Sequence, residues 1–321
     1  MPLQEDGMQD NLLQLFPMER RTFWSATAAQ QKNIQEIRLR CNKPIVVIVN
    51  GKETFLDKDG NFMDNPEKAY CAENPEIEAI LNHVCHYSLY AFEDELRQGF
   101  ITVPGGHRVG IVGQVVLEGD GSVRTIKNIS CVNIRISHQI YGVADKILPY
   151  IYENGYLKNT LIISPPGCGK TTLLRDMIRQ ISDGNSYSEG MCVGVVDERS
   201  EIAGSYQGIA QNDVGMRTDV LDACPKALGM MLLLRSMSPR VIAIDELGGE
   251  EDMHALHMAS SCGSKIIATV HGADKLDVVR RFGMRGESLE QLFDCFVVLA
   301  KEQGKPIGKN ILGKEEKVCC D

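Results

Sequence analysis

The residues best suited to chemistry stand together in one short segment, Ser164-Pro165-Pro166-Gly167-Cys168-Gly169-Lys170-Thr171. The segment lies between an apolar run, Leu161 to Ile163, and a helix-like stretch, Thr172 to Ile181. Glycines in such a loop let backbone N–H groups turn around phosphates, and the positive end of the following helix faces them. The spacing therefore predicts a loop that binds ATP.

Two residues of this loop have individual predicted roles. Lys170 reaches the β and γ phosphates, and Thr171 holds Mg²⁺, while the remaining loop residues and Thr172 surround the nucleotide. The usual pattern begins with Gly, and Ser164 stands there instead, a small residue that the position tolerates. The alternative is a glycine-rich turn that merely joins a strand to a helix.

A second candidate is a pair of carboxylates, Asp245 and Glu246, that follows the apolar run Val241 to Ile244. We expect Asp245 to hold Mg²⁺ through water, and Glu246 to orient and deprotonate the attacking water. Acids that begin a helix are the alternative, because Gly248-Gly249-Glu250-Glu251 follows. The phosphate-binding loop upstream favours the catalytic interpretation.

Two further strand ends carry polar side chains. Glu198 follows the run Val195-Val196-Asp197, and His271 follows Ala268-Thr269-Val270. A lone histidine at a strand end is more often structural than catalytic. Four such strand ends meet at one edge of a parallel sheet, where ligands bind, and this favours a role for His271.

The elements that would position these residues differ between the two halves of the chain. The second half alternates buried runs with helices, which indicates an α/β domain with a parallel sheet. The first half has a strand with a period of two at Ile34 to Arg40, a hairpin turn at Asn50-Gly51 and a helix beginning near Asn74, which indicates a smaller α+β domain. We predict domains at residues 1–150 and 151–305, with a polar tail at 306–321.

Composition narrows the classes of function. A length of 321 residues suits two domains, and a net charge of -9 argues against a protein that mainly neutralises nucleic-acid backbones. The 11 cysteines are odd in number and form no Cys-x-x-Cys pair, so we expect reduced thiols in a cytoplasm. No run approaches the ~20 apolar residues that span a bilayer, so any membrane role is expected to work through partners.

The order of these motifs resembles that of the type II and type IV secretion and pilus-retraction ATPases. Five segments closely resemble one branch of that group, the stage III sporulation AA family: Glu36 to Arg40 (EIRLR), His107 to Gly113 (HRVGIVG), Asn133 to Ile136 (NIRI), Asp213 to Ala227 (DVGMRTDVLDACPKA) and Leu234 to Gly248 (LRSMSPRVIAIDELG). The resemblance covers nearly the whole chain. It implies a RecA-like P-loop ATPase domain behind a smaller N-terminal domain.

The resemblance also implies an assembly and a place of action. The chain would form a homo-oligomeric ring, a hexamer, on the mother-cell side of a membrane channel between mother cell and forespore. Its partners would be membrane-embedded channel proteins, with no nucleic acid.

Residue by residue, the resemblance assigns the phosphate and water-activating roles to Lys170, Thr171, Asp245 and Glu246. It assigns Glu198 to the acidic motif of these ATPases, the acidic box, and His271 to their histidine motif, the histidine box. Three arginines are candidates for completing the nucleotide site of the neighbouring subunit in the ring: Arg135, Arg217 and Arg235. Each arginine could equally be solvated or ion-paired.

Two other classes of function stay open. RecA-like domains also move on nucleic acids, although the acidic charge and the single Trp leave few stacking platforms for single strands. A scaffold that binds ATP without turnover is the third class, and a positioned base such as Glu246 argues against it.

Overall fold

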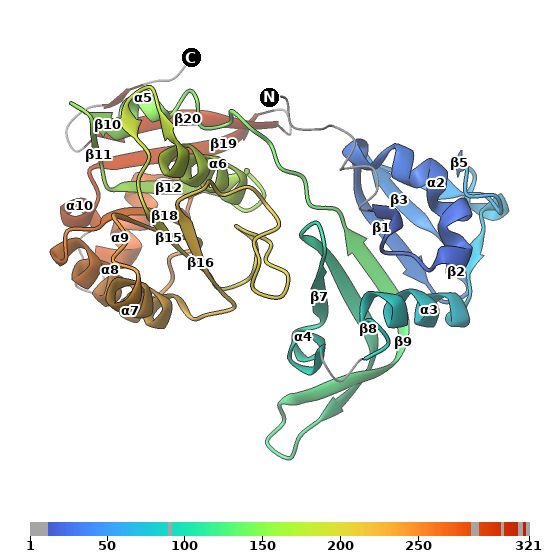
Figure 1. Ribbon diagram of the computed structural model, residues 1–321. Helices are drawn as coiled ribbons and strands as arrows, with labels where there is room; N and C mark the ends of the chain where they lie inside the picture. Colours follow the sequence, from blue (N-terminus) through green and yellow to red (C-terminus); the bar gives the residue numbers. More distant parts are fainter. Residues whose placement is uncertain (1–11, 89–91, 284–288, 303–304, 314–316, 319–321) are drawn as a thin grey trace. The chain divides into compact units, whose positions relative to one another are not determined.

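The computed structural model describes residues 12–88, 92–283, 289–302, 305–313 and 317–318. The chain forms two compact units, Met1–His138 (unit 1) and Gln139–Asp321 (unit 2) (Figure 1). This division falls ahead of the one that the sequence predicts at residue 150. Within the described residues no helix is long and apolar enough to cross a membrane, and the cysteines there are free thiols.

Unit 1 is a seven-stranded antiparallel sheet in the order β5-β4-β3-β1-β9-β8-β7. Its strands are β5 (Phe62–Met63), β4 (Lys52–Leu56), β3 (Val46–Val49), β1 (Ile34–Arg40), β9 (Val123–Arg135), β8 (His107–Leu117) and β7 (Phe100–Val103). The helices are α2 (Arg21–Ala29), α3 (Asn74–Val84) and α4 (Glu93–Gln98), and β2 (Lys43–Pro44) pairs with β6 (Cys71–Ala72).

The local signals in unit 1 act as the sequence predicts. Asn50 and Gly51 have φ angles of 50° and 77°, the left-handed pair that a tight hairpin turn between β3 and β4 requires. Along β1, Ile37 and Leu39 are buried and Arg38 is only partly covered. The helices bury Trp24, Ile77 and Leu96 in the same core as the inward-facing strand residues.

Unit 2 is built on an eight-stranded sheet in the order β16-β15-β17-β18-β12-β19-β20-β21, whose first six strands are parallel. These are β16 (Thr218–Asp222), β15 (Val193–Asp197), β17 (Val241–Ile244), β18 (Lys265–His271), β12 (Thr160–Ser164) and β19 (Cys295–Glu302). Two short hairpins flank the sheet: β10 (Tyr152–Glu153) with β11 (Tyr156–Leu157), and β13 (Gly184–Asn185) with β14 (Ser188–Glu189). The predicted α/β fold with a parallel sheet behind a smaller α+β domain is confirmed.

Two strands of the main sheet of unit 2, β16 and β20, are not among the buried apolar runs that the sequence predicts as strands. The strand β16 is an edge strand with two acids, Asp219 and Asp222, and only intermediate burial, so it lacks the apolar run of a buried parallel strand. The strand β20 (Lys305–Gly313) pairs antiparallel with β19, so residues 305–313 extend the sheet within the segment expected as a polar tail. The short β21 (Lys317–Val318) pairs with β20, and the rest of that tail lies outside the described residues.

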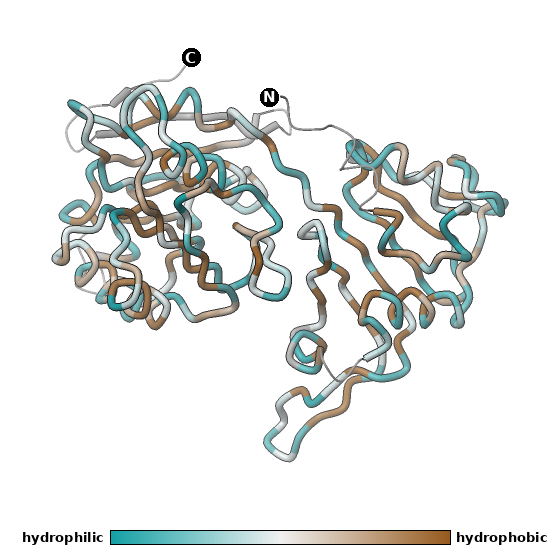
Figure 2. The backbone as a smooth tube through the Cα atoms, viewed as in Figure 1, coloured by the Kyte–Doolittle hydropathy of each residue, from teal (hydrophilic) through white to brown (hydrophobic). Residues whose placement is uncertain are grey.

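Helices cover both faces of the parallel sheet, as strands buried on both sides require. One face packs against α6 (Lys170–Asp183) and α5 (Leu148–Ile151). The other packs against α7 (Lys226–Ser236), α8 (Glu250–Ser261), α9 (Lys275–Gly283) and α10 (Leu289–Leu292). Figure 2 shows the apolar strands running through the middle of this unit. Neighbouring residues of one strand enter opposite cores: Ile162 faces α6, whereas Leu161 and Ile163 face α8 and α9.

Candidate functional site

The loop Ser164–Thr171 joins the end of β12 to the start of α6, the context that a phosphate-binding loop requires. Gly167 and Gly169 have φ angles of 70° and 82°, a left-handed conformation that glycine adopts without a steric cost. Gly169 is the residue immediately before α6. The backbone N–H groups of the first turn of α6 therefore lie beside the loop, in a position that attracts anions.

The carboxylate of Asp245 lies next to the loop because β17 ends at Ile244, close to the start of α6. The Thr171 hydroxyl donates a hydrogen bond of 2.6 Å to Asp245 Oδ2. Hydroxyl and carboxylate oxygens are the ligand types that Mg²⁺ prefers. The donor set formed by Thr171 and Asp245 therefore fits this ion.

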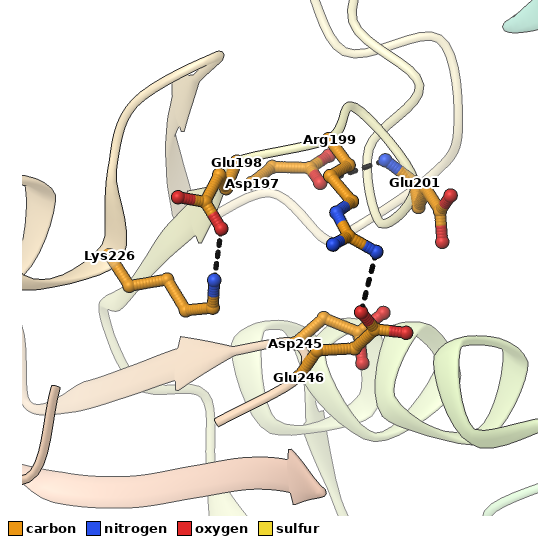
Figure 3. A pocket seen from close by; sticks show the side chains of 7 residues that line it. All are labelled: Asp197, Glu198, Arg199, Glu201, Lys226, Asp245 and Glu246. Carbon is orange, nitrogen blue, oxygen red and sulfur yellow. Dashed lines mark hydrogen bonds and ion pairs between the residues drawn. The ribbon is translucent and has the colours of Figure 1, made fainter. Parts of the chain in front are cut away.

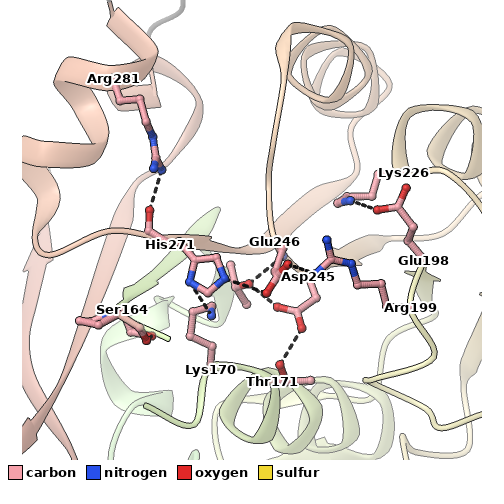
Figure 4. Close-up of polar contacts among 12 residues, drawn as sticks. Ser164, Lys170, Thr171, Glu198, Arg199, Lys226, Asp245, Glu246, His271 and Arg281 are labelled. Carbon is pink, nitrogen blue, oxygen red and sulfur yellow. Dashed lines mark hydrogen bonds and ion pairs between the residues drawn. The ribbon is translucent and has the colours of Figure 1, made fainter. Parts of the chain in front are cut away.

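Glu246, His271 and Lys170 form a chain of contacts over the loop (Figure 4). Lys170 Nζ lies 3.3 Å from His271 Nδ1, and His271 Nε2 lies 2.8 Å from Glu246 Oε1. Lysine can only donate, so Nδ1 accepts and Nε2 carries the hydrogen that Glu246 accepts. His271 thereby connects the loop lysine to the carboxylate.

Arg199 contacts the second oxygen of the same carboxylate, donating from Nη1 to Glu246 Oε2 at 2.7 Å. Partial burial raises the pKa of Glu246, but the hydrogen bond from His271 and the charges of Arg199 and Lys170 outweigh it, and the net pKa is lowered. Glu246 is therefore ionised at neutral pH. Its φ of 57° is unusual for a residue other than glycine, and such conformations cluster at functional sites.

The acidic segment after β15 contributes one structural and one exposed carboxylate. Asp197 is 2% exposed and accepts backbone N–H groups from Glu201, Ile202 and Ala203, which fixes the loop after the strand. Burial raises its pKa against these hydrogen bonds. Glu198 instead forms an ion pair with Lys226 at the start of α7.

A small pocket connects the acidic segment to the carboxylates after β17 (Figure 3). Its lining is charged throughout: Asp197, Glu198, Arg199, Glu201, Lys226, Asp245 and Glu246. Two of the predicted residues, Glu198 and Glu246, thus face the same space without contacting one another.

None of the three predicted arginines takes part in these contacts within the described residues. Arg217 Nη1 donates 2.9 Å to the Ser182 carbonyl near the C-terminal end of α6, whose opposite end holds the phosphate loop. Arg235 is exposed in the last turn of α7. Arg135 belongs to unit 1, where it lies 3.4 Å from Glu36 and lines a groove with Arg38, Arg40 and Arg108.

Sequence reasoning assigned no role to two residues that touch the central carboxylates, Arg199 and Thr269. The Thr269 hydroxyl contacts Asp245 Oδ1 and accepts the Glu246 N–H at 2.9 Å. Both residues stand in segments that the sequence singled out, the acidic segment and the strand before His271. Only the order of strands in the sheet brings their side chains to Asp245 and Glu246.

The family profile "Sporulation stage III, protein AA" matches residues 6–317 of the chain. The chain belongs to the stage III sporulation protein AA family. The stage III sporulation protein AA of Bacillus subtilis (strain 168) is 39% identical over 310 residues, which cover 96% of each chain. The resemblance expected from the motifs is confirmed.

Two solved structures are similar in fold to this member of the stage III sporulation AA family. The X-ray structure of the Legionella pneumophila ATPase DotB has a TM-score of 0.59 at 16% identity, covering 93% of this chain and 81% of that one. The crystal structure of the pilus retraction motor PilT with bound ADP has a TM-score of 0.60 at 16% identity, covering 91% and 82%. At such identities the likeness is one of fold.

Proposed function

We propose that this chain is an ATPase that hydrolyses ATP to ADP and phosphate. The observation that carries the proposal is the chain of contacts that joins the loop lysine to a carboxylate through His271. Lys170 begins α6, Glu246 follows β17 and His271 ends β18, and the three side chains meet at the carboxyl edge of the sheet. A purely structural loop has no need of this convergence.

The side chains at the loop would divide the reaction between them. The N–H groups at the start of α6 and the Lys170 ammonium bind the phosphates. Glu246 orients a water molecule and accepts its proton as the water oxygen attacks the γ phosphorus, and the bond to the β-γ bridging oxygen breaks. His271 holds Glu246 in place from the side of the loop.

Thr171 and Asp245 are the residues that would hold Mg²⁺. The ion, when bound, neutralises charge on the β and γ phosphates. The direct hydrogen bond between Thr171 and Asp245 keeps the threonine hydroxyl oxygen and the carboxylate Oδ2 close together beside the loop.

The proposal extends to a ring of identical subunits, a hexamer, that drives or assembles a membrane channel between mother cell and forespore in sporulating cells. The family membership supports the sporulation role, and the fold shared with DotB and PilT supports a secretion-type motor. The chain would act in the mother-cell cytoplasm and reach the membrane through channel proteins.

In such a ring an arginine of one subunit would complete the neighbour's site. Arg217 is held by carbonyls of α6, whereas Arg235 is exposed and Arg135 lines a groove with other arginines. Mixing each arginine-to-alanine variant with Lys170→Ala tests this idea. Activity regained by two inactive proteins assigns the arginine to the neighbour's site, and mixed rings without activity exclude that arginine.

The decisive experiment separates binding from turnover. Lys170→Ala should lose binding of a fluorescent ATP analogue, whereas Glu246→Gln should bind it and lose turnover about 100-fold or more. Glu250→Gln, on the exposed start of α8, is the matched control. Binding without turnover in the unaltered protein would indicate a scaffold, and stimulation by single-stranded DNA a nucleic-acid motor.

A further inference from the structure

Thr269 is a fully buried residue of β18 whose hydroxyl contacts the carboxylate of Asp245 and the backbone N–H of Glu246. Its side chain is 0% exposed. The register of β17 and β18 pairs Ile244 with Ala268, so Thr269 stands beside Asp245, where β17 has just ended. A polar side chain at this depth needs hydrogen-bond partners, and the two acidic residues that follow β17 provide them.

The hydroxyl of Thr269 makes two hydrogen bonds in opposite senses. It donates to Asp245 Oδ1, and it accepts the backbone N–H of Glu246 at 2.9 Å. Asp245 Oδ2 accepts from Thr171 at the same time, at 2.6 Å. Each oxygen of the Asp245 carboxylate thus has a hydroxyl partner, and its orientation is fixed.

The backbone of Thr269 holds the turn from the other side of Glu246. The Thr269 carbonyl accepts the N–H of Leu247 at 2.7 Å. Glu246 therefore lies between two hydrogen bonds to one residue, in its left-handed conformation with a φ of 57°. Such a conformation persists only where the surroundings over-determine it, and here Thr269 does so.

We propose that Thr269 is a positioning residue that sets the Asp245 carboxylate for Mg²⁺ and the Glu246 carboxylate for the attacking water. This inference rests on the proposed function, because it gives Thr269 its effect through residues with roles in ATP hydrolysis. One hydroxyl thereby links the metal ligand and the base. Removing it should disturb both, because the hydroxyl contacts Asp245 and Glu246.

The matched comparison uses two buried threonines of the same sheet. Thr160 is also 0% exposed, and its hydroxyl donates 3.0 Å to the Lys158 carbonyl at the start of β12, the opposite edge from the site. Thr269→Val and Thr160→Val both replace a buried hydroxyl with a methyl group. They differ in whether that hydroxyl contacts the Asp245 carboxylate and the Glu246 backbone.

The experiment measures two quantities on the full chain: the Mg²⁺ concentration that half-saturates binding of a fluorescent ATP analogue, and the kcat and KM for ATP hydrolysis. Thr269→Val should raise the Mg²⁺ requirement and lower kcat, each by about 10- to 100-fold, the usual cost of losing a partner that orients a metal ligand. KM at saturating Mg²⁺ should change far less. Thr269→Ser should restore both quantities to nearly those of the unaltered protein.

Equal values for Thr269→Val and Thr160→Val in both measurements would overturn the inference. If Thr269→Val does not fold, the pair Thr269→Ser and Thr269→Cys decides: both lack the methyl group, and only the serine keeps a strong hydroxyl donor. An unaltered protein without turnover would contradict the proposed function. The Mg²⁺ dependence of binding would still show whether Thr269 orients Asp245.

Discussion

Charged and histidine side chains occupy strands in both units, but the two sheets distribute them differently. In unit 2 they follow the ends of parallel strands, where Asp245, Glu246 and His271 gather beside the phosphate loop. In unit 1 the arginines Arg38 and Arg108 project from an antiparallel sheet into an open groove. His107, at the start of β8, is buried and contacts the backbone of Ser137.

Strand direction explains this difference. Parallel strands all end at one edge, so the residues that follow them meet there, together with the start of the helix that follows β12. Antiparallel strands end at alternating edges, so their polar residues share a face rather than an edge. Unit 2 therefore gathers its polar side chains at one edge of its sheet, whereas unit 1 spreads them over a face.

The largest expected effect comes from cutting the chain between the units. A fragment of residues 139–321 should fold and bind ATP with Mg²⁺, because its core is complete. A fragment of residues 151–321 loses Ala144, Ile147 and Leu148, all buried in the core of unit 2, and the hydrogen bond from the Ala144 N–H to Asp176. We expect it to be less stable by more than about 5 kcal/mol.

Thermal unfolding followed by circular dichroism, with binding of the ATP analogue, measures this prediction. Equal stability of the two fragments would place the division at residue 150. A folded 139–321 fragment that binds no ATP would show that unit 1 contributes to the nucleotide site.

The next largest effect is a loss of ATP turnover on substitution of His271, the histidine at the end of β18, compared with an exposed histidine of α8. His271→Ala should lower ATP turnover roughly 100-fold, because Glu246 loses the partner that holds it beside the loop. The melting temperature should change little, since the His271 side chain is 40% exposed. His254→Ala, on the exposed face of α8, is the control. Unchanged turnover in His271→Ala would remove His271 from the site.

The buried histidine of unit 1 should act on stability through pH. Burial, with a smaller contribution from His138, lowers the pKa of His107 from 6.5 to about 4. The unfolded chain therefore binds a proton that the folded unit does not between these values. The stabilisation is complete above pH 6.5 and is lost as the pH falls towards 4, by up to about 3 kcal/mol.

Trp24, the single tryptophan, is buried in unit 1, so its fluorescence reports the unfolding of this unit alone. His107→Asn should flatten the fall in the free energy of unfolding between pH 6.5 and 4, while its Oδ1 can still accept the Ser137 N–H. His83→Asn, on α3, should leave the slope unchanged. The same slope in all three proteins would contradict a neutral His107.

The smallest expected effect concerns Arg217, a charge of unit 2 that stands just before the start of β16 and not at the carboxyl end of a strand. Arg217→Ala should lower stability by about 1 kcal/mol, the usual value of a cation that contacts the last carbonyls of a helix. Arg235→Ala, which removes an exposed side chain, should change stability less. A loss of turnover approaching 10³-fold in Arg217→Ala with no change in stability would instead indicate an arginine that acts on a neighbour's nucleotide.

The phosphate loop and the carboxylates were predictable because their signals are local. Gly167 and Gly169 supply left-handed conformations next to a buried strand, and Asp245 follows an unbroken apolar run. The strand β16 was missed because an edge strand needs no apolar run. Its pairing with β15 is set by the tertiary structure and cannot be recognised from the residues of β16 alone.

The sequence by itself thus determined the family, the parallel sheet and the residue types at the ends of its strands. The tertiary structure alone decided which side chains touch: Thr269 with Asp245, Arg199 with Glu246, and Glu198 with Lys226. The physical reason is the strand order. Because β18 lies between β17 and β12, residues far apart in the chain become neighbours at one edge, and no local pattern records that adjacency.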